Sequence, residues 1–156
     1  MVTTYRDDHR PGTPWHLWLV GILALLFTAF GCYDYTMTQL GDREYIAASM
    51  APVGVDADTA LRYFENFPIW MHAVWAIGVW GGLAGAILLL LRSRFAYLVF
   101  GVSIVAFIIS NAYGLINPIP GMQSGAAMYG AVAVVFVVML AFLLYARSMT
   151  RRGVLR

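Results

Sequence analysis

The sequence predicts an all-α polytopic membrane protein, with a bundle of four transmembrane helices and a short amphipathic helix in the first outer loop. Four continuously apolar stretches, roughly 15–37, 68–91, 95–116 and 125–145, each reach the ~20 residues that cross a bilayer as a helix. Hydrophobic residues make up 61% of the chain and charged residues 12%, which is outside the balance of soluble domains. Little chain lies outside these stretches, so residues 1–156 are expected to form one integral membrane domain.

Helices are favoured over the other structures that apolar stretches can form. Strands of a membrane barrel are about 10 residues of alternating polarity, whereas these stretches are apolar throughout. A removable signal peptide could begin with Arg6 and Arg10, but the apolar run that follows is longer than such signals have. A lipoprotein signal is disfavoured because bulky Phe30 lies close before Cys32, where a small side chain is required. We therefore expect 15–37 to be a retained transmembrane helix.

The outer loop, 38–67, is expected to contain structure of its own. Residues 42–50 are predicted to extend the first helix by one or two turns, until a proline and a glycine stop it. Asp56 or Asp58 then caps a short helix. Its apolar residues recur at spacings of three and four: Ala57, Leu61 and Phe64. Such a helix lies flat on the outer surface, either as a cap over the mouth of the bundle or as a docking surface for a partner.

The other three helices have recognisable ends. Pro68 suits the position before the first helical turn, and the Trp70 ring is an interfacial anchor. A short link with Arg92 and Arg94 joins the second and third helices. Residues 117–121, Asn-Pro-Ile-Pro-Gly, cannot continue a helix and predict a tight outer turn before the fourth.

The arginines predict the orientation in the membrane. The chain has ten basic and eight acidic residues, and a net charge of +2 is too small to indicate a nucleic-acid partner. All but two of the basic residues lie on one predicted side: Arg6, Arg10, Arg92, Arg94, Arg147, Arg151, Arg152 and Arg156. Positively charged segments stay in the cytoplasm, so both termini are expected inside and the loop 38–67 outside. We expect a multi-pass protein of a bacterial cytoplasmic (inner) membrane.

Glycines mark one face of the second helix. Gly78 with Gly82, and Gly81 with Gly85, form two small-xxx-small pairs that let helix backbones approach closely in lipid. Glycine weakens a helix by about 1 kcal/mol, so four glycines indicate a close contact with another helix. That helix is either the first or the last of this chain, which is the simpler interpretation, or belongs to another subunit.

Polar residues at one depth suggest a candidate pocket near the outer ends of the helices. They are Asp34, His72, Asn111 and Tyr129. Polar groups inside a membrane are costly unless they have partners, so this layer could form an outward-facing polar pocket. Simpler explanations are water at a helix end for Asp34, a structural hydrogen bond for His72 and interhelical bonding for Asn111. No His or carboxylate pair has the spacing of metal ligands, so neither a metal nor a cofactor is expected.

No catalytic chemistry is predicted. The sequence has no nucleophile–base pair, phosphate loop, dinucleotide fingerprint or haem-ligating histidine pair within the spans, so we do not expect an enzyme. A transporter normally has a charged or broken-helix site near the midplane, and the centres of these four spans are uncharged. The leading hypothesis is an accessory or structural subunit of a membrane assembly, with a larger membrane protein or a second copy as partner. The alternative is an oligomeric small-solute transporter or channel that uses the polar pocket, and a membrane enzyme or redox carrier is third.

Two segments resemble known proteins. Residues 30–38, FGCYDYTMT, and 67–81, FPIWMHAVWAIGVWG, are similar to a group of small four-helix inner-membrane proteins of Gram-negative bacteria. The resemblance covers most of the chain, including LLLLRSR at 88–94. It implies the same fold and location. The sugar-transporter description sometimes given to that group is not supported by the residues here, and the group supplies no catalytic positions.

Overall fold

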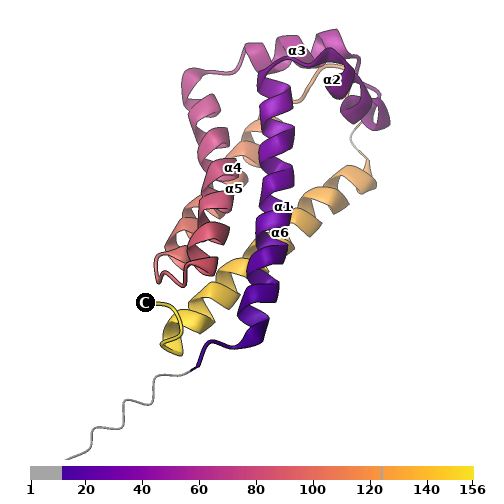
Figure 1. Cartoon of the computed structure of the whole chain (residues 1–156). Coiled ribbons are helices and arrows are strands. Elements are labelled where there is room, and N and C mark those ends of the chain that lie inside the picture. Colours follow the sequence, from indigo (N-terminus) through magenta and orange to yellow (C-terminus); the bar gives the residue numbers. More distant parts are fainter. Residues whose placement is uncertain (1–11, 124) are drawn as a thin grey trace, which may run out of the picture.

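A computed structural model of the chain describes residues 12–123 and 125–156 (Figure 1). In these residues the structure is helical and contains no strand. The helices are α1 (Trp15–Gln39), α2 (Arg43–Met50), the 3₁₀ helix η1 (Ala51–Val53), α3 (Ala57–Glu65), α4 (Ile69–Leu90), α5 (Ala96–Ile116) and α6 (Ala126–Arg151). Four of them, α1, α4, α5 and α6, are long and apolar enough to cross a membrane. The predicted all-α, four-span fold is therefore confirmed, and the protein is a multi-pass membrane protein.

The loop between α1 and α4 differs from the sequence prediction. Residues 42–50 do not extend α1, because the chain turns at Gly41, whose φ is +68°, a conformation that glycine adopts without strain. Asp42 then starts the separate helix α2, and its side chain accepts a hydrogen bond from the Tyr45 N–H at 2.9 Å. The predicted amphipathic helix is present as α3. Of the two candidate caps, Asp56 is the one that accepts from the Thr59 N–H.

The segments α2, η1 and α3 form a cap across one end of the bundle, where α1 ends and α4 begins (Figure 1). Its small core joins Ile46, Val55 and Ala60 to Ile119 of the α5–α6 link. Two hydrogen bonds tie the cap to the same link. The Tyr63 hydroxyl donates to the Asn117 carbonyl at 2.6 Å, and the Gln123 N–H donates to the Val53 carbonyl at 2.9 Å. These contacts favour the interpretation of this loop as a cap over the bundle mouth.

Helix α4 is the centre of the bundle because it packs against both α1 and α5. The glycine face of α4 makes these contacts. A Cβ atom added at Gly85 would lie 2.8 Å from the Phe100 ring, and one at Gly81 would lie 3.4 Å from Ser103 Cβ. A Cβ at Gly82 would meet Thr28 of α1 at 3.2 Å. The glycines therefore face mainly α5 and, at Gly82, also α1. The sequence had suggested the first or the last helix as their partner. Contact with the first helix is present, but the main partner is α5, and the contacts found at these glycines do not involve α6.

Helix α6 continues six residues beyond the predicted end at 145. Its last turns are held by the main core, at the arginine-rich end of the bundle, where Ala146 and Met149 are buried with Leu17 and Leu89. After α6 the chain returns to the α4–α5 link (Figure 1). There Val154 and Leu155 are buried and backbone hydrogen bonds join the terminal residue to both arginines of the link.

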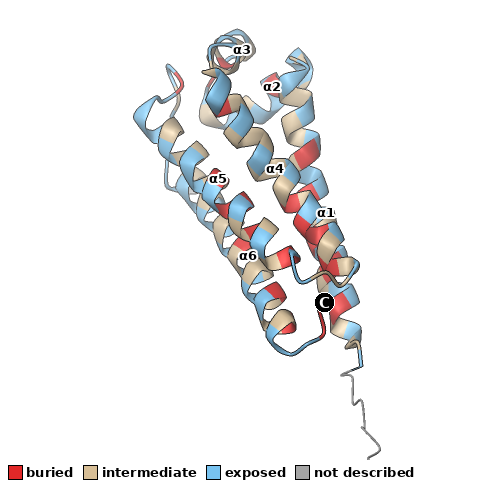
Figure 2. Ribbon diagram, turned by 90° about the vertical axis from the view of Figure 1, so that its left-hand side faces the viewer, coloured by how far each residue is buried: buried red, intermediate tan, exposed pale blue. Residues whose placement is uncertain are grey.

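The other half of α6 leans away from the remaining spans (Figure 1). The described residues of α6 that are buried, Met139, Ala146 and Met149, all lie in its second half. In its most apolar window 6% of the residues are buried, compared with 28% in α1 and 22% in α4 and α5. Figure 2 shows the same pattern, with buried residues concentrated where α1 and α4 meet and near the C-terminus. Three packed spans thus carry a fourth that is attached mainly at one end.

Candidate functional site

Asp34 lies in the last third of α1, half-buried beneath the cap. The Tyr45 hydroxyl of α2 donates to Asp34 Oδ1 at 2.7 Å. Burial, followed by this hydrogen bond and the carboxylate charge, raises the pKa of Tyr45 to about 12. The Tyr33 ring lies edge-on to the Tyr45 ring, with centroids 5.5 Å apart. The one acidic side chain of α1 is therefore held by the cap.

A cavity of about 400 Å³, here called the membrane cavity, opens beside Asp34 between α1, α4, α5 and α6. Most of its lining is apolar, and its polar side chains are those of Asp34, Thr28, Ser110 and Asn111. The apolar lining residues are Phe27, Phe30, Trp75, Val79, Phe107, Val135 and Met139, with Gly31, Gly78 and Gly82 completing the wall. The Thr28 hydroxyl donates to the Ala24 carbonyl within its own helix, so it offers no free proton to the cavity.

A second cavity of about 420 Å³, the outer cavity, lies beneath the cap between α3, α4, α5 and α6. It shares Trp75, Ser110 and Asn111 with the membrane cavity. The aromatic rings of Phe64, Phe67 and Trp75 pack on one another in its wall, with Phe64 stacked on Trp75 at 5.5 Å between centroids. The two cavities therefore follow one another from the cap into the bundle and meet at one turn of α5.

The predicted polar residues are only partly brought together. Asp34 and Asn111 line the membrane cavity, and Asn111 and Tyr129 line the outer cavity. His72 lines neither cavity. Its Nδ1 atom lies 3.2 Å from Gln39 Nε2, and its ring packs against the Phe67 ring. The Asn111 amide donates to the carbonyl of residue 107 in the preceding turn of α5, so within the described residues it bonds locally instead of joining two helices.

Two lining residues have a larger part in this site than the sequence indicated. Trp75 lines both cavities, and the only sequence signal was its place among the tryptophans of the second helix. Ser110 does so too, and its hydroxyl oxygen is buried without a hydrogen-bond partner among the described residues. A buried hydroxyl without a partner costs about 1–3 kcal/mol, so this atom is a natural contact for a polar group entering either cavity.

The lining determines which ligands these cavities suit. Aromatic and aliphatic side chains dominate, with one carboxylate at the rim and a few hydroxyl and amide groups where the cavities meet. Such a surface accommodates an apolar body with one polar end better than a fully polar solute. Among the described residues no group of three His, Cys, Asp or Glu side chains could hold a metal ion.

Comparison of the chain with known protein families, with curated proteins and with solved structures found no match. The resemblance to small four-helix inner-membrane proteins therefore stays a prediction, and the functional argument depends on the geometry of this chain.

Proposed function

We propose that the protein is a non-enzymatic accessory or structural subunit of an assembly in the cytoplasmic membrane, and that a transmembrane helix of its partner packs between α1 and α6. The observation that carries the proposal is the poor packing of the first half of α6. Helices associate in lipid through van der Waals contact, so a span that leans away from its neighbours leaves much of that contact unmade. The membrane cavity marks where the contact is missing.

Two glycines support this position for a partner helix. A Cβ atom added at Gly31 of α1 or at Gly130 of α6 would have no described atom within 4 Å, in contrast to the packed glycines of α4. Gly31 lines the membrane cavity, where Phe30 beside it is 70% exposed. Small residues next to exposed apolar ones allow a foreign backbone to approach closely, which is how transmembrane helices usually associate.

Purification in mild detergent tests this proposal. The tagged wild-type chain should co-purify with a membrane partner or a second copy in reproducible stoichiometry. Gly31→Leu should reduce that association, because the larger side chain fills the space into which the partner helix packs. Ala112→Leu, at an exposed position of α5 that lines neither cavity, is a similar small-to-large control and should leave the association unchanged. A lone monomer under these conditions, or equal losses in both variants, would contradict the proposal.

The proposed orientation places both termini in the cytoplasm and the cap outside. It is supported by the positions of the arginines and by the acidic residues of α2 and α3 at the opposite end. In a Cys32→Ala background, Asp58→Cys should react with a membrane-impermeant thiol reagent in intact cells, whereas Arg152→Cys should react only after lysis. Labelling in the reverse order would overturn this orientation.

A second candidate function is an oligomeric carrier or channel for a small solute. It is favoured by the junction of the two cavities at Ser110 and Asn111 and by the unpartnered Ser110 hydroxyl. Reconstituted liposomes should then show a flux that Asp34→Asn reduces, whereas His72→Asn, outside both cavities, should not affect it. Absence of flux, or flux unchanged by Asp34→Asn, would exclude this function.

A further inference from the structure

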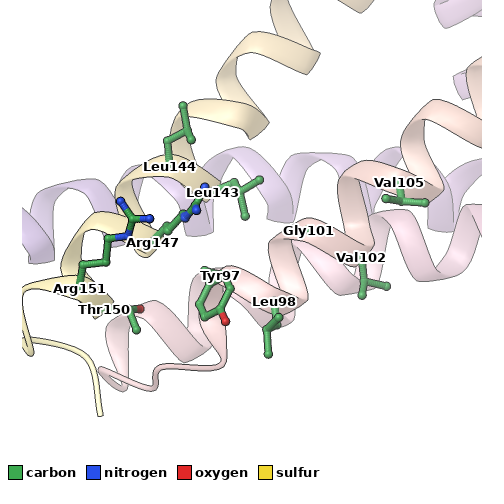
Figure 3. Close-up of a pocket in the computed structure, with 10 residues that line it drawn as sticks. All are labelled: Tyr97, Leu98, Gly101, Val102, Val105, Leu143, Leu144, Arg147, Thr150 and Arg151. Atoms are coloured by element: carbon green, nitrogen blue, oxygen red, sulfur yellow. The ribbon is translucent and has the colours of Figure 1, made fainter.

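A third hollow lies on the lipid-facing side of α5 and α6, at the arginine-rich end of the bundle. This groove has a volume of about 740 Å³, which is more than either cavity of the candidate site. Figure 3 shows its lining residues, which come from the first half of α5 and the last turns of α6. They are Tyr97, Leu98, Gly101, Val102, Val105, Leu143, Leu144, Arg147, Thr150 and Arg151.

The polar end of the groove carries positive charge. Arg147 and Arg151 are four residues apart, so both project from one face of α6, opposite Tyr97 at the start of α5 (Figure 3). The Thr150 hydroxyl donates to the Ala146 carbonyl, so the two guanidinium groups are the main donors. In residues 12–123 and 125–156 the side-chain carboxylates all lie toward the other end: Asp34, Asp42, Glu44, Asp56, Asp58 and Glu65. The side chains of the described residues therefore supply no carboxylate near the groove, and the abundant anions at a membrane surface are lipid phosphates.

The rest of the groove is apolar and runs along the membrane-spanning part of α5. Val102 and Val105 are each 57% exposed, and Leu98 and Leu144 are exposed beside them. From Tyr97 to Val105 the helix rises by about 12 Å, which compares with about 15 Å for one leaflet of the hydrocarbon core. Gly101 forms the floor, because a Cβ atom there would touch only Leu143, at 3.9 Å. The groove is thus long enough, and open enough to the bilayer, for an acyl chain.

We propose that this groove binds an anionic phospholipid, with the headgroup phosphate on Arg147 and Arg151 and an acyl chain lying over Gly101. Guanidinium groups bind phosphate through paired charge-assisted hydrogen bonds, and basic pockets between transmembrane helices are a recurrent way to hold anionic headgroups. The charge at one end and the apolar floor at the other match the two parts of one lipid molecule. The site is independent of the proposed partner helix, which packs at the opposite end of α6.

Native mass spectrometry of the full chain, released from nanodiscs of equal phosphatidylglycerol and phosphatidylcholine, tests the proposal. The wild type should retain phosphatidylglycerol in preference to phosphatidylcholine. The double variant Arg147→Gln/Arg151→Gln should lower that preference by about 10-fold or more, because it removes the charge-assisted hydrogen bonds to the phosphate. Gly101→Leu should lower retention of the lipid while leaving both arginines in place, because the larger side chain fills the floor.

The matched control is Arg152→Gln/Arg156→Gln, which removes the same charge from the same end of the chain but from residues that do not line the groove. It should keep the preference for phosphatidylglycerol. Equal losses in the two double variants would show that only the general charge attracts the lipid and would overturn the proposal. Equal retention of both lipids by the wild type would do the same. Helical circular dichroism of each variant excludes misfolding as the cause.

Discussion

Replacing Gly85 by alanine should destabilise the bundle, and the size of the effect follows from its contact with Phe100. An added Cβ would lie 2.8 to 3.0 Å from three atoms of the Phe100 ring, closer than side-chain carbons pack. The ring is 1% exposed in the main core, so it cannot swing away. Overpacking of this kind costs about 1–3 kcal/mol. Removing a helical glycine recovers about 1 kcal/mol, which leaves a net loss of about 1 kcal/mol on average.

Gly78→Ala is the matched control because it makes the same change on the same face of α4. There the added Cβ would lie 3.5 Å from the Ala106 side chain, an ordinary van der Waals distance. Only the gain in helix propensity then remains, so the variant should be neutral or more stable by up to about 1 kcal/mol. The two alanine variants should therefore differ by about 1–3 kcal/mol in the free energy of unfolding.

Unfolding by sodium dodecyl sulfate in mild-detergent micelles, followed by circular dichroism, measures this difference. A second arm combines Gly85→Ala with Phe100→Leu, which removes the ring that the new methyl group meets. The loss caused by Gly85→Ala should then be smaller than in the wild-type background, so the double-mutant cycle should show coupling. Equal stabilities of the two alanine variants, or strictly additive effects in the cycle, would refute the packing of α4 on α5 described here.

Other predictions concern the cap and the serines of α5. The raised pKa of Tyr45, about 12 compared with the usual 10.0, means that its proton stabilises the fold below pH 10 and that this stabilisation is lost as the pH rises toward 12. Tyr45→Phe should therefore reduce the loss of stability at alkaline pH in unfolding experiments, and the raised pKa of Tyr63 accounts for part of the loss that remains. Hydrogen bonds from the Thr59 side chain and N–H hold the pKa of Asp56 below its usual value, so acidification through that pKa should destabilise α3. In the Asp56→Ala variant the amide protons of α3 should exchange faster than in the wild type even at neutral pH. Ser103→Ala should lower the free energy of unfolding by about 0.6 kcal/mol, because the hydroxyl donates a hydrogen bond to a carbonyl of α4. Ser110→Ala should be neutral or stabilising, because the hydroxyl has no partner among the described residues. Equal losses in detergent unfolding would contradict the assignment of the Ser110 hydroxyl as unpartnered.

The spans could be predicted from the sequence because crossing a bilayer depends on local composition. A helix of about 20 apolar residues is stable in the hydrocarbon core regardless of the segments around it, so the four helices form where the apolar stretches predict them. The end of α6 could not be located in this way. Its last turns are stabilised because Ala146 and Met149 are buried in the main core, and the local composition of the sequence gives no signal for such tertiary contacts. By contrast, the break before α2 had a local signal in Gly41 and Asp42 that favours a turn and a new cap.

The candidate site was less predictable because it depends on how each helix is rotated. Depth along a helix follows from residue number, and on that basis Asp34, His72 and Asn111 fall in one layer. Rotation is determined by packing, which turns His72 toward Gln39 and away from both cavities. The partner of the α4 glycines was unpredictable for the same reason: small residues occur on several helices, and only the assembled bundle shows that Ser103 and Phe100 of α5 occupy that face.

The uneven attachment of α6 leads to a last prediction about motion. Core contacts hold α6 at the arginine-rich end. Toward the cap, the membrane cavity lies between the described residues of α6 and α1. Spin labels at Tyr33 and Tyr129, near the cap, should therefore give a broader distance distribution than labels at Trp15 and Arg152, at the other end. Binding of a helix between α1 and α6 should narrow the first distribution and leave the second unchanged, because only the first spans the unfilled space. Equally narrow distributions in the purified monomer would mean that α6 is fixed without a partner, and the main support for an accessory subunit would be lost.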